Sequence, residues 1–154
     1  MIIPAQTLRL LQPVKPFHER TVAHGMTYGL GPAGYDVRIA QRVQLKPGAF
    51  ALASTIEQFF IPNDVIAFVH DKSSWARRGL AVQNTVLEPG WVGFLTLELS
   101  THGRETLTIE DGSPIAQIIF HRLEETTELP YRGRYQNQQA GPQPAIEAAE
   151  KEQQ

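Results

Sequence analysis

Apolar residues along this chain occur mostly in short runs that are rich in β-branched side chains and are separated by Gly, Pro and Asn. This pattern is typical of an all-β domain. The intervening residues suit turns, because Gly, Pro, Asn and Asp favour the backbone conformations that turns require. Seven short strands of this kind predict a sandwich or jelly roll. We expect them at residues 36–43, 50–56, 65–70, 80–83, 94–100, 106–109 and 115–122.

The C-terminal part of the chain has a different character. The length of 154 residues and the hydrophobic content of 42% suit one domain with a sizeable core. After Leu129, however, the sequence is nearly free of aliphatic residues until Ile146, so this stretch cannot form a core of its own. We expect it to be mobile, or ordered only by a ligand or a neighbour. The expected organisation is one β domain over residues 1–128 and a C-terminal lid segment and disordered tail over residues 129–154.

Charge and apolar runs exclude two classes of protein. The formal net charge is −2, with 14 basic and 16 acidic residues, so the chain lacks the positive excess expected of a nucleic-acid-binding protein. Any phosphate binding must therefore be local. No apolar run approaches the roughly 20 residues that a membrane span requires, and the first residues lack the order of a signal peptide. We expect a cytoplasmic protein.

The sequence contains no cysteine, which limits the available chemistry. Disulfides, a thiolate nucleophile and cysteine-ligated zinc are all excluded. The exclusion extends to the zinc site by which many base deaminases ionise water. The 5 histidines show no spacing typical of a metal site. We therefore expect no zinc and no other metal held by protein ligands alone.

One acid interrupts the apolar strand predicted at residues 94–100. Alternation along a strand places Leu95, Leu97 and Leu99 on one face. The opposite face then carries Phe94, Thr96, Glu98 and Ser100. Two interpretations stay open at this point. Glu98 lies either on a solvated outer face or in a cleft, where it could act as a general base on water.

The one helix expected in the β domain covers residues 73–78. Ser73 and Ser74 could cap its start, and Gly79 suits its end. A helix start presents free backbone N–H groups that attract anions, and neighbouring cations add to this attraction. Ser73 and Arg77 would share a helix face toward a ligand or a subunit boundary. The segment is a candidate phosphate site, and the alternative is an ordinary capped helix with surface charges.

The C-terminal segment combines aromatic rings, cations and amides, notably Tyr131, Arg134, Tyr135 and Gln138. A flexible segment of this composition could close over a nucleotide as a lid. The alternative is a disordered extension without a role in binding.

Several motifs, taken in order over residues 31–142, resemble those of the dCTP deaminase and trimeric dUTPase superfamily. They are Ala33-Gly34-Tyr35-Asp36-Val37, Lys72-Ser73-Ser74-Trp75-Ala76-Arg77, Glu88-Pro89-Gly90-Trp91 with Leu97-Glu98, and Pro114-Ile115-Ala116-Gln117-Ile118-Ile119-Phe120. Residues 134–139 resemble the deaminase lid, and no segment resembles the glycine-rich terminal motif of ordinary dUTPases. The resemblance implies a distorted jelly-roll β-barrel of the dUTPase-like type, assembled as a homotrimer with active sites at subunit boundaries.

The same resemblance implies metal-free deamination of dCTP to dUTP and ammonia. Glu98 would be the general base, and Arg77 would reach across a subunit boundary toward the catalytic group. Magnesium would bind through the phosphates of the nucleotide, without a protein cage. The residues implied to bind substrate are Lys72, Ser73, Ser74, Arg134 and Gln138 at the triphosphate, Glu88 and Tyr131 near the deoxyribose, and in addition Thr96 and Tyr135.

The predicted hairpin between Gly79 and Pro89 departs from the deaminase pattern. It is shorter, it lacks an arginine just before the acid, and Glu88 replaces the usual aspartate. Because this hairpin grips the base in the family, we hypothesise that a modified pyrimidine or another base could be the preferred substrate. A dUTP diphosphatase, with Glu88 orienting water at the α-phosphate, a bifunctional enzyme and a non-catalytic nucleotide sensor stay as alternatives.

Overall fold

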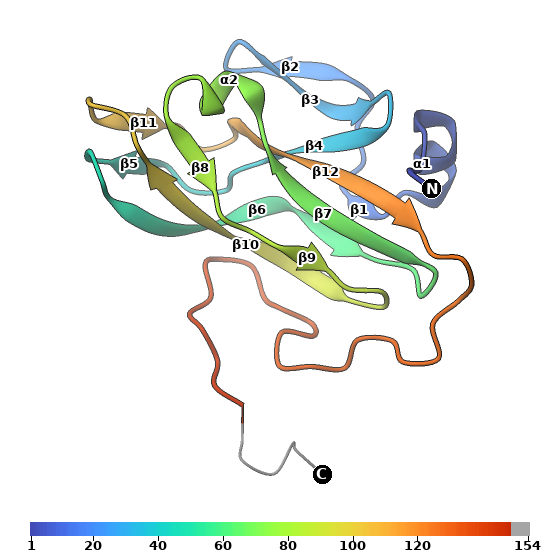
Figure 1. Cartoon of the computed structure of the whole chain (residues 1–154). Coiled ribbons are helices and arrows are strands. Elements are labelled where there is room, and N and C mark those ends of the chain that lie inside the picture. Colours follow the sequence, from blue (N-terminus) through green and yellow to red (C-terminus); the bar gives the residue numbers. More distant parts are fainter. Residues whose placement is uncertain (149–154) are drawn as a thin grey trace.

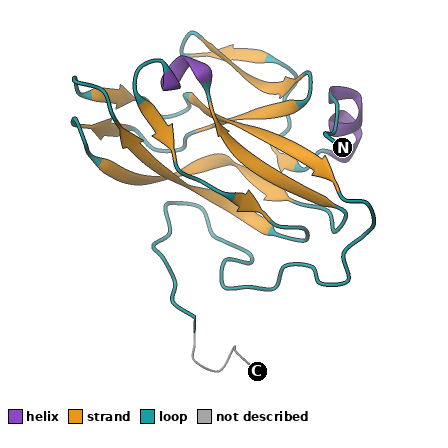
Figure 2. Ribbon diagram, in the orientation of Figure 1, coloured by secondary structure: helices purple, strands orange, loops and turns teal. Residues whose placement is uncertain are grey.

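The computed structural model describes residues 1–148, which are built mostly of strands (Figures 1 and 2). The two helices are α1 (Ala5–Leu11) and α2 (Ser73–Ala76). Within this described part, no helix is long and apolar enough to cross a membrane. The strands are β1 (Val14–Lys15), β2 (Thr21–Ala23), β3 (Met26–Gly31), β4 (Gly34–Arg38), β5 (Val43–Leu45), β6 (Phe50–Phe60), β7 (Val65–Asp71), β8 (Leu80–Val82), β9 (Val86–Leu87), β10 (Val92–Thr101), β11 (Leu107–Ile109) and β12 (Pro114–Arg122).

The strands form two larger sheets and one small sheet. One sheet has the order β1-β6-β10-β8, the second has the order β2-β3-β4-β12-β7-β9, and β5 pairs with β11. Pairs within these sheets are antiparallel. The two larger sheets curl around a shared core (Figure 1), so the predicted all-β, distorted jelly-roll barrel is confirmed.

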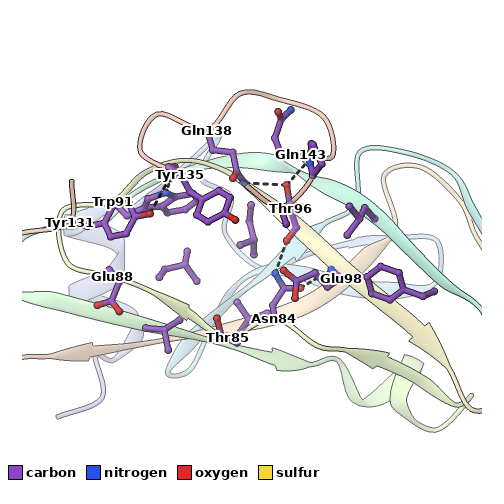
Figure 3. Close-up of a pocket in the computed structure, with 18 residues that line it drawn as sticks. Asn84, Thr85, Glu88, Trp91, Thr96, Glu98, Tyr131, Tyr135, Gln138 and Gln143 are labelled. Atoms are coloured by element: carbon purple, nitrogen blue, oxygen red, sulfur yellow. Dashed lines mark hydrogen bonds between the residues drawn. The ribbon is translucent and has the colours of Figure 1, made fainter. Parts of the chain in front are cut away.

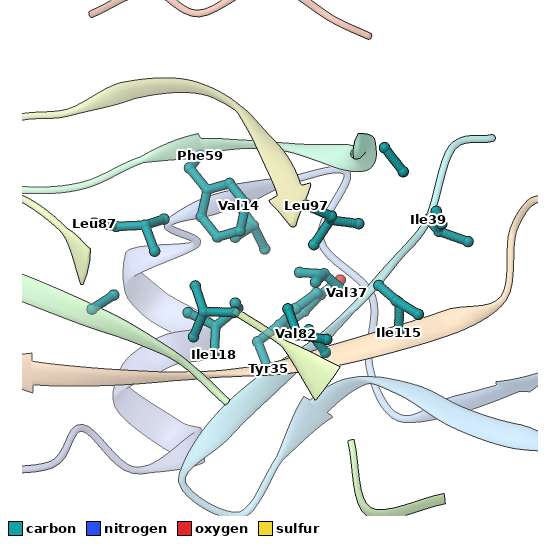
Figure 4. Packing of buried hydrophobic residues seen from close by; sticks show 14 of the residues in the cluster. Val14, Tyr35, Val37, Ile39, Phe59, Val82, Leu87, Leu97, Ile115 and Ile118 are labelled. Atoms are coloured by element: carbon teal, nitrogen blue, oxygen red, sulfur yellow. The ribbon is translucent and has the colours of Figure 1, made fainter. Parts of the chain in front are cut away.

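Alternate positions of the central strands fill the core. On β7, Val65, Ala67 and Val69 are buried, whereas the residues between them are more exposed. On β10, Leu97 and Leu99 are fully buried. Successive side chains of a strand point to opposite faces, so the short apolar runs of the sequence supply one inward face per strand. Figure 4 shows other members of the core, among them Tyr35, Phe59 and Ile118.

Each of the seven predicted segments contains strand residues, but the bounds differ. The segment at residues 36–43 is divided, because its first part pairs in the six-stranded sheet and its last residue begins β5 in the small sheet. The largest omission is at the N-terminal end, where α1, β1, β2 and β3 were not predicted. These elements are short, and they depend on pairing with distant segments, such as Val14 with Phe59.

Strand β6 continues beyond the predicted end at residue 56, through a charged residue. Glu57 is 0% exposed. Its carboxylate accepts hydrogen bonds from the backbone N–H of Arg38 at 2.9 Å and from Arg38 Nε at 2.8 Å. A buried charge is tolerated when it is paired and hydrogen-bonded, so this strand can run through the interior despite the acid.

The pairing of β10 with β6 contains an irregularity that the alternation pattern did not predict. Phe94 pairs with Gln58 and Thr96 pairs with Ser54, so β6 has extra residues opposite Leu95. The N–H of Leu95 instead donates to the hydroxyl of Thr55 at 3.1 Å. Leu95 is partly buried and packs against the core, whereas Leu97 and Leu99 are fully buried.

Helix α2 is shorter than predicted. Its N-cap residue is Lys72, and no side chain caps the helix start, so the expected capping by Ser73 or Ser74 is wrong. Gly79 has a φ of 93°, a left-handed conformation that glycine adopts without strain. The expected role of Gly79 after the helix is therefore confirmed.

Candidate active site

A pocket of about 490 Å³ lies beside β10, between the two larger sheets and the C-terminal segment (Figure 3). We call it the Glu98 pocket. One wall comes from β6 and β10, a second from the chain between β8 and β10, and the third from the C-terminal segment. Its lining residues are Phe50, Leu52, Val69, Asn84, Thr85, Val86, Leu87, Glu88, Trp91, Leu95, Thr96, Glu98, Tyr131, Tyr135, Gln138, Gln143, Pro144 and Ala145.

Glu98 is partly buried in this pocket. Burial raises the pKa of its carboxyl above the usual range, because removing the group from water disfavours the charged form. No ion pair involves this carboxylate within residues 1–148. Of the two interpretations left open by the strand pattern, the cleft is confirmed. A half-buried, unpaired carboxylate of this kind can exchange protons with a bound water.

The register shift between β6 and β10 lies at the wall of this pocket. Leu95 lines the pocket together with Thr96 and Glu98, while Leu97 stays in the core. The wall that carries Glu98 therefore also presents an apolar side chain.

Thr96 is buried, and its hydroxyl is bound by the C-terminal segment. It accepts hydrogen bonds from Gln138 Nε2 at 3.1 Å and from the backbone N–H of Gln143 at 3.0 Å (Figure 3). Gln138 Nε2 also donates to the carbonyl of Phe94 at 2.7 Å. Thr96 and Gln138, both expected to bind substrate, thus meet in the same pocket and contact each other.

The C-terminal segment runs along the start of β10. Gln138 bridges to Gly93 in parallel, and the carbonyl of Gln138 accepts the N–H of Phe94 at 3.0 Å. Only glycine permits this approach, because a Cβ on Gly93 would lie 2.8 Å from the backbone nitrogen of Gln138. Trp91 Nε1 donates to the carbonyl of Tyr135 at 2.7 Å. The C-terminal segment thus forms part of the wall of the Glu98 pocket. Of the predicted lid segment and tail at residues 129–154, residues 149–154 lie outside the described residues.

Gln136 anchors this segment, although its sequence context gave no sign of that role. Its Oε1 accepts the N–H of Val92 at 2.8 Å, and its Nε2 donates to the carbonyls of Gly90 at 2.8 Å and Tyr131 at 3.2 Å. One amide thus joins the turn before β10 to two parts of the tail. Several glutamines occur nearby, and composition alone does not distinguish the one that is inserted.

Lys72 and Ser73 line a different pocket, of about 270 Å³, which we call the Lys72 pocket. It lies between β3, β4, β12 and the start of α2. Lys72 is 8% exposed, and its Nζ is 2.6 Å from the carboxylate of Asp36. Gln117 of β12 and Arg20 also line this hollow. The cation and hydroxyl expected at the triphosphate are therefore separate from Glu98 within one chain.

The structure thus divides the predicted site residues into groups. Ser74, Arg77 and Arg134 line neither pocket, and Arg77 and Arg134 are exposed. No group of three or more His, Asp or Glu residues able to hold a metal ion occurs in residues 1–148. The Glu98 pocket brings together Glu88, Thr96, Glu98, Tyr131, Tyr135 and Gln138.

Comparisons with known proteins show which family this chain is similar to. The family described as dCTP deaminase-like matches residues 34–123. The dCTP deaminase of Acidobacterium capsulatum is 33% identical over 82% of this chain and 87% of that protein. The dCTP deaminase of Thermococcus sibiricus is 32% identical over 90% of this chain and 94% of that protein.

Solved structures share the fold at lower identity. The 2'-deoxycytidine 5'-triphosphate deaminase of Agrobacterium tumefaciens has a TM-score of 0.65 and 19% identity, and the match covers 79% of this chain and 47% of that one. The EIAV dUTPase has a TM-score of 0.55 and 20% identity, over 64% of this chain and 82% of that one. The dUTPase-like barrel and the sequence relatives together lead to one conclusion: the chain belongs to the dCTP deaminase-like family.

Proposed function

We propose that this protein is a dCTP deaminase, which converts dCTP and water to dUTP and ammonia. The observation that carries the proposal is Glu98, an unpaired and partly buried carboxylate on the wall of a pocket large enough for a nucleoside. The sequence relatives that cover most of the chain are dCTP deaminases, which supports the same reaction.

In this reaction Glu98 acts as the proton shuttle. Ionised Glu98 takes a proton from water, and the oxygen forms a bond to C4 of cytosine. Glu98 passes that proton to N3 of the ring. It then moves the proton of the new hydroxyl to the amino group, the C4–N bond breaks, and ammonia leaves as the C4 carbonyl forms. Atoms and charges balance without a metal-bound water.

The remaining groups of the pocket suit the sugar and the base. Tyr131 and Tyr135 offer aromatic faces on the wall formed by the C-terminal segment, and Glu88 lies on the same pocket. An aromatic ring against the 2' carbon of the sugar would select a deoxyribonucleotide by leaving no room for a hydroxyl. Magnesium would bind through the triphosphate, since the described residues offer no cluster of metal ligands.

We further propose that the working enzyme is a homotrimer, with each active site at a subunit boundary. Within one chain, Lys72 and Ser73 line the Lys72 pocket. No residue lines both this pocket and the Glu98 pocket. A second copy could place these groups at the triphosphate of a nucleotide whose base lies beside Glu98. Exposed Arg77, the C-cap residue of α2, would reach the same boundary.

A product assay tests the proposed reaction. Purified protein with magnesium is given a panel of deoxynucleoside triphosphates that includes dCTP, 5-substituted dCTP analogues and dUTP, and ammonia and pyrophosphate are measured separately. Ammonia from dCTP is the expected result. Turnover restricted to a 5-substituted analogue would assign a modified pyrimidine, in line with the shorter hairpin before Glu88. No ammonia from any cytosine nucleotide would reject the proposal.

The second candidate function is dUTP diphosphatase, alone or combined with deamination. It is favoured by Glu88, a second acid on the same pocket, and by the shared fold of dUTPase structures. In that reaction Glu88 would orient water toward the α-phosphate. Pyrophosphate released from dUTP without ammonia from dCTP would favour this alternative, and release of both would identify a bifunctional enzyme.

A further inference from the structure

Strands β8 and β10 separate beside Glu98. Val82 pairs with Leu99, and the N–H of Gln83 donates to the carbonyl of Glu98 at 2.8 Å. A regular antiparallel ladder would continue with the Glu98 N–H bonded to the Gln83 carbonyl, and with the Thr96 carbonyl bonded to the N–H of residue 85. The chain instead leaves β10 and enters β9, which pairs with β7 in the other sheet.

The side chain of Asn84 makes both of the missing bonds. Its Oδ1 accepts the N–H of Glu98 at 2.9 Å, and its Nδ2 donates to the carbonyl of Thr96 at 2.6 Å (Figure 3). One amide side chain thus takes the place of a backbone peptide group of the absent strand. The polar groups of β10 stay satisfied, and the backbone from Thr85 onward is free to form the opposite wall of the pocket.

We propose that Asn84 is a positioning residue for the general base. It holds the peptide of Glu98 at the point where the two sheets part, and so directs the carboxylate into the pocket. Without it, the Glu98 N–H and the Thr96 carbonyl lose their partners at the floor of an open hollow, and water or a strand shift must replace them. The kinetic part of this inference rests on the proposed deaminase activity, and the hydrogen-exchange part does not.

Amide hydrogen exchange tests the contact independently of activity. In Asn84→Ala, exchange at the Glu98 N–H should accelerate by about tenfold or more, because its acceptor is gone. Gln83→Ala is the matched control, since Gln83 is exposed and contacts β10 through its backbone. Unchanged exchange at Glu98 in Asn84→Ala, or equal acceleration in the control, would overturn the assignment.

Kinetics test the consequence for Glu98. A misplacement of about 1 Å can cost about 10²-fold in rate, so Asn84→Ala should lower kcat by about 10-fold to 10²-fold while KM changes less than about twofold. The acid limb of the kcat profile should move to lower pH, because water admitted beside Glu98 reduces the burial that raises its pKa. This variant keeps the other titratable residues that line the pocket, which are Glu88, Tyr131 and Tyr135. A variant with wild-type kcat, or with a rise in KM alone, would contradict the positioning role.

Asn84→Asp keeps the inference testable if the alanine variant does not fold. Aspartate retains an acceptor for the Glu98 N–H but faces the Thr96 carbonyl with a second oxygen instead of a donor. We expect near-normal protection of the Glu98 amide, a lower kcat, and an acid limb moved to higher pH, because a second negative charge disfavours ionised Glu98. Wild-type kcat would overturn the inference. Absence of ammonia from the wild-type protein would instead reject the proposed function.

Discussion

The two pockets of this molecule carry different chemistry. The Glu98 pocket is lined by two acids, aromatic rings, amides and aliphatic side chains, and no lysine, arginine or histidine is among these described residues. The Lys72 pocket is lined by two cations and two acids, with an ion pair between Lys72 and Asp36. The acids of the Glu98 pocket can accept a proton beside an uncharged ring. In the Lys72 pocket, a bound anion could replace Asp36 as the partner of Lys72.

Because of this difference, the described residues of one chain place no cation on the wall of the Glu98 pocket. A triphosphate placed in the Glu98 pocket of a single copy would face carboxylates without a compensating cation, which is electrostatically unfavourable. In the proposed trimer, the Glu98 pocket of one subunit would hold the base and the Lys72 pocket of a second subunit would hold the phosphates.

The strongest test of the Glu98 pocket is Glu98→Gln. Glutamine keeps the shape and cannot take a proton from water, so kcat for ammonia release should fall by about 10²-fold to 10⁴-fold. Nucleotide affinity, measured by calorimetry, should stay close to that of the wild type. Glu110→Gln is a matched control, because Glu110 is exposed and pairs with Arg42 beside the small sheet. Substantial turnover by Glu98→Gln would remove the residue from its proposed role.

Mixed trimers test whether the two pockets serve one site. Lys72→Ala should weaken triphosphate binding by about 10-fold to 10²-fold, because it removes a charged contact. Co-expression of Lys72→Ala and Glu98→Gln subunits should restore activity to about a quarter of the wild-type level, since one boundary in four then combines two intact half-sites. Activity no higher than that of the separate variants would show that each chain serves its own nucleotide.

The pH dependence distinguishes Glu98 from an ordinary surface acid. The base must be ionised, and burial raises its pKa, so kcat should fall on the acid side at a higher pH than for an exposed glutamate. The free energy of unfolding has the opposite pH dependence, because ionisation of Glu98 lowers stability while it raises kcat. The burial cost is absent while Glu98 is protonated, begins as pH rises through the unfolded-state pKa, and is complete above the folded-state pKa. Thermal unfolding should show Glu98→Gln slightly more stable than wild type at neutral pH and equal to it at acid pH.

The smallest expected effect concerns the wall formed by the C-terminal segment. Gln136→Ala removes the hydrogen bonds that join this segment to the turn before β10, so KM should rise by about tenfold with a smaller change in the melting temperature. Gln139→Ala is the control, because Gln139 is exposed and, within residues 1–148, its side chain donates a hydrogen bond only to the carbonyl of Asn137. An equal effect of both changes would mean that Gln136 is not the anchor.

Local sequence determined much of this architecture. Short apolar runs with a period of two predicted most strands. Each strand needs one buried face, and this requirement produces an alternation of apolar and polar residues that is visible in the sequence. Glu98 could be selected for the same reason, as the acid on the polar face of an apolar strand. The family motifs added the expected chemistry and the lid.

Tertiary structure decided the features that depend on residues far apart in the chain. The length of β6 depends on Arg38 neutralising buried Glu57, and the N–H of Leu95 finds its acceptor in the hydroxyl of Thr55, where the register of β6 and β10 shifts. Asn84 acquires its role only where β8 leaves β10. The period of a strand is visible in consecutive residues, but hydrogen-bond partners depend on which segments meet in space. A single sequence therefore shows which residues can donate or accept hydrogen bonds, but it does not show which of them form pairs.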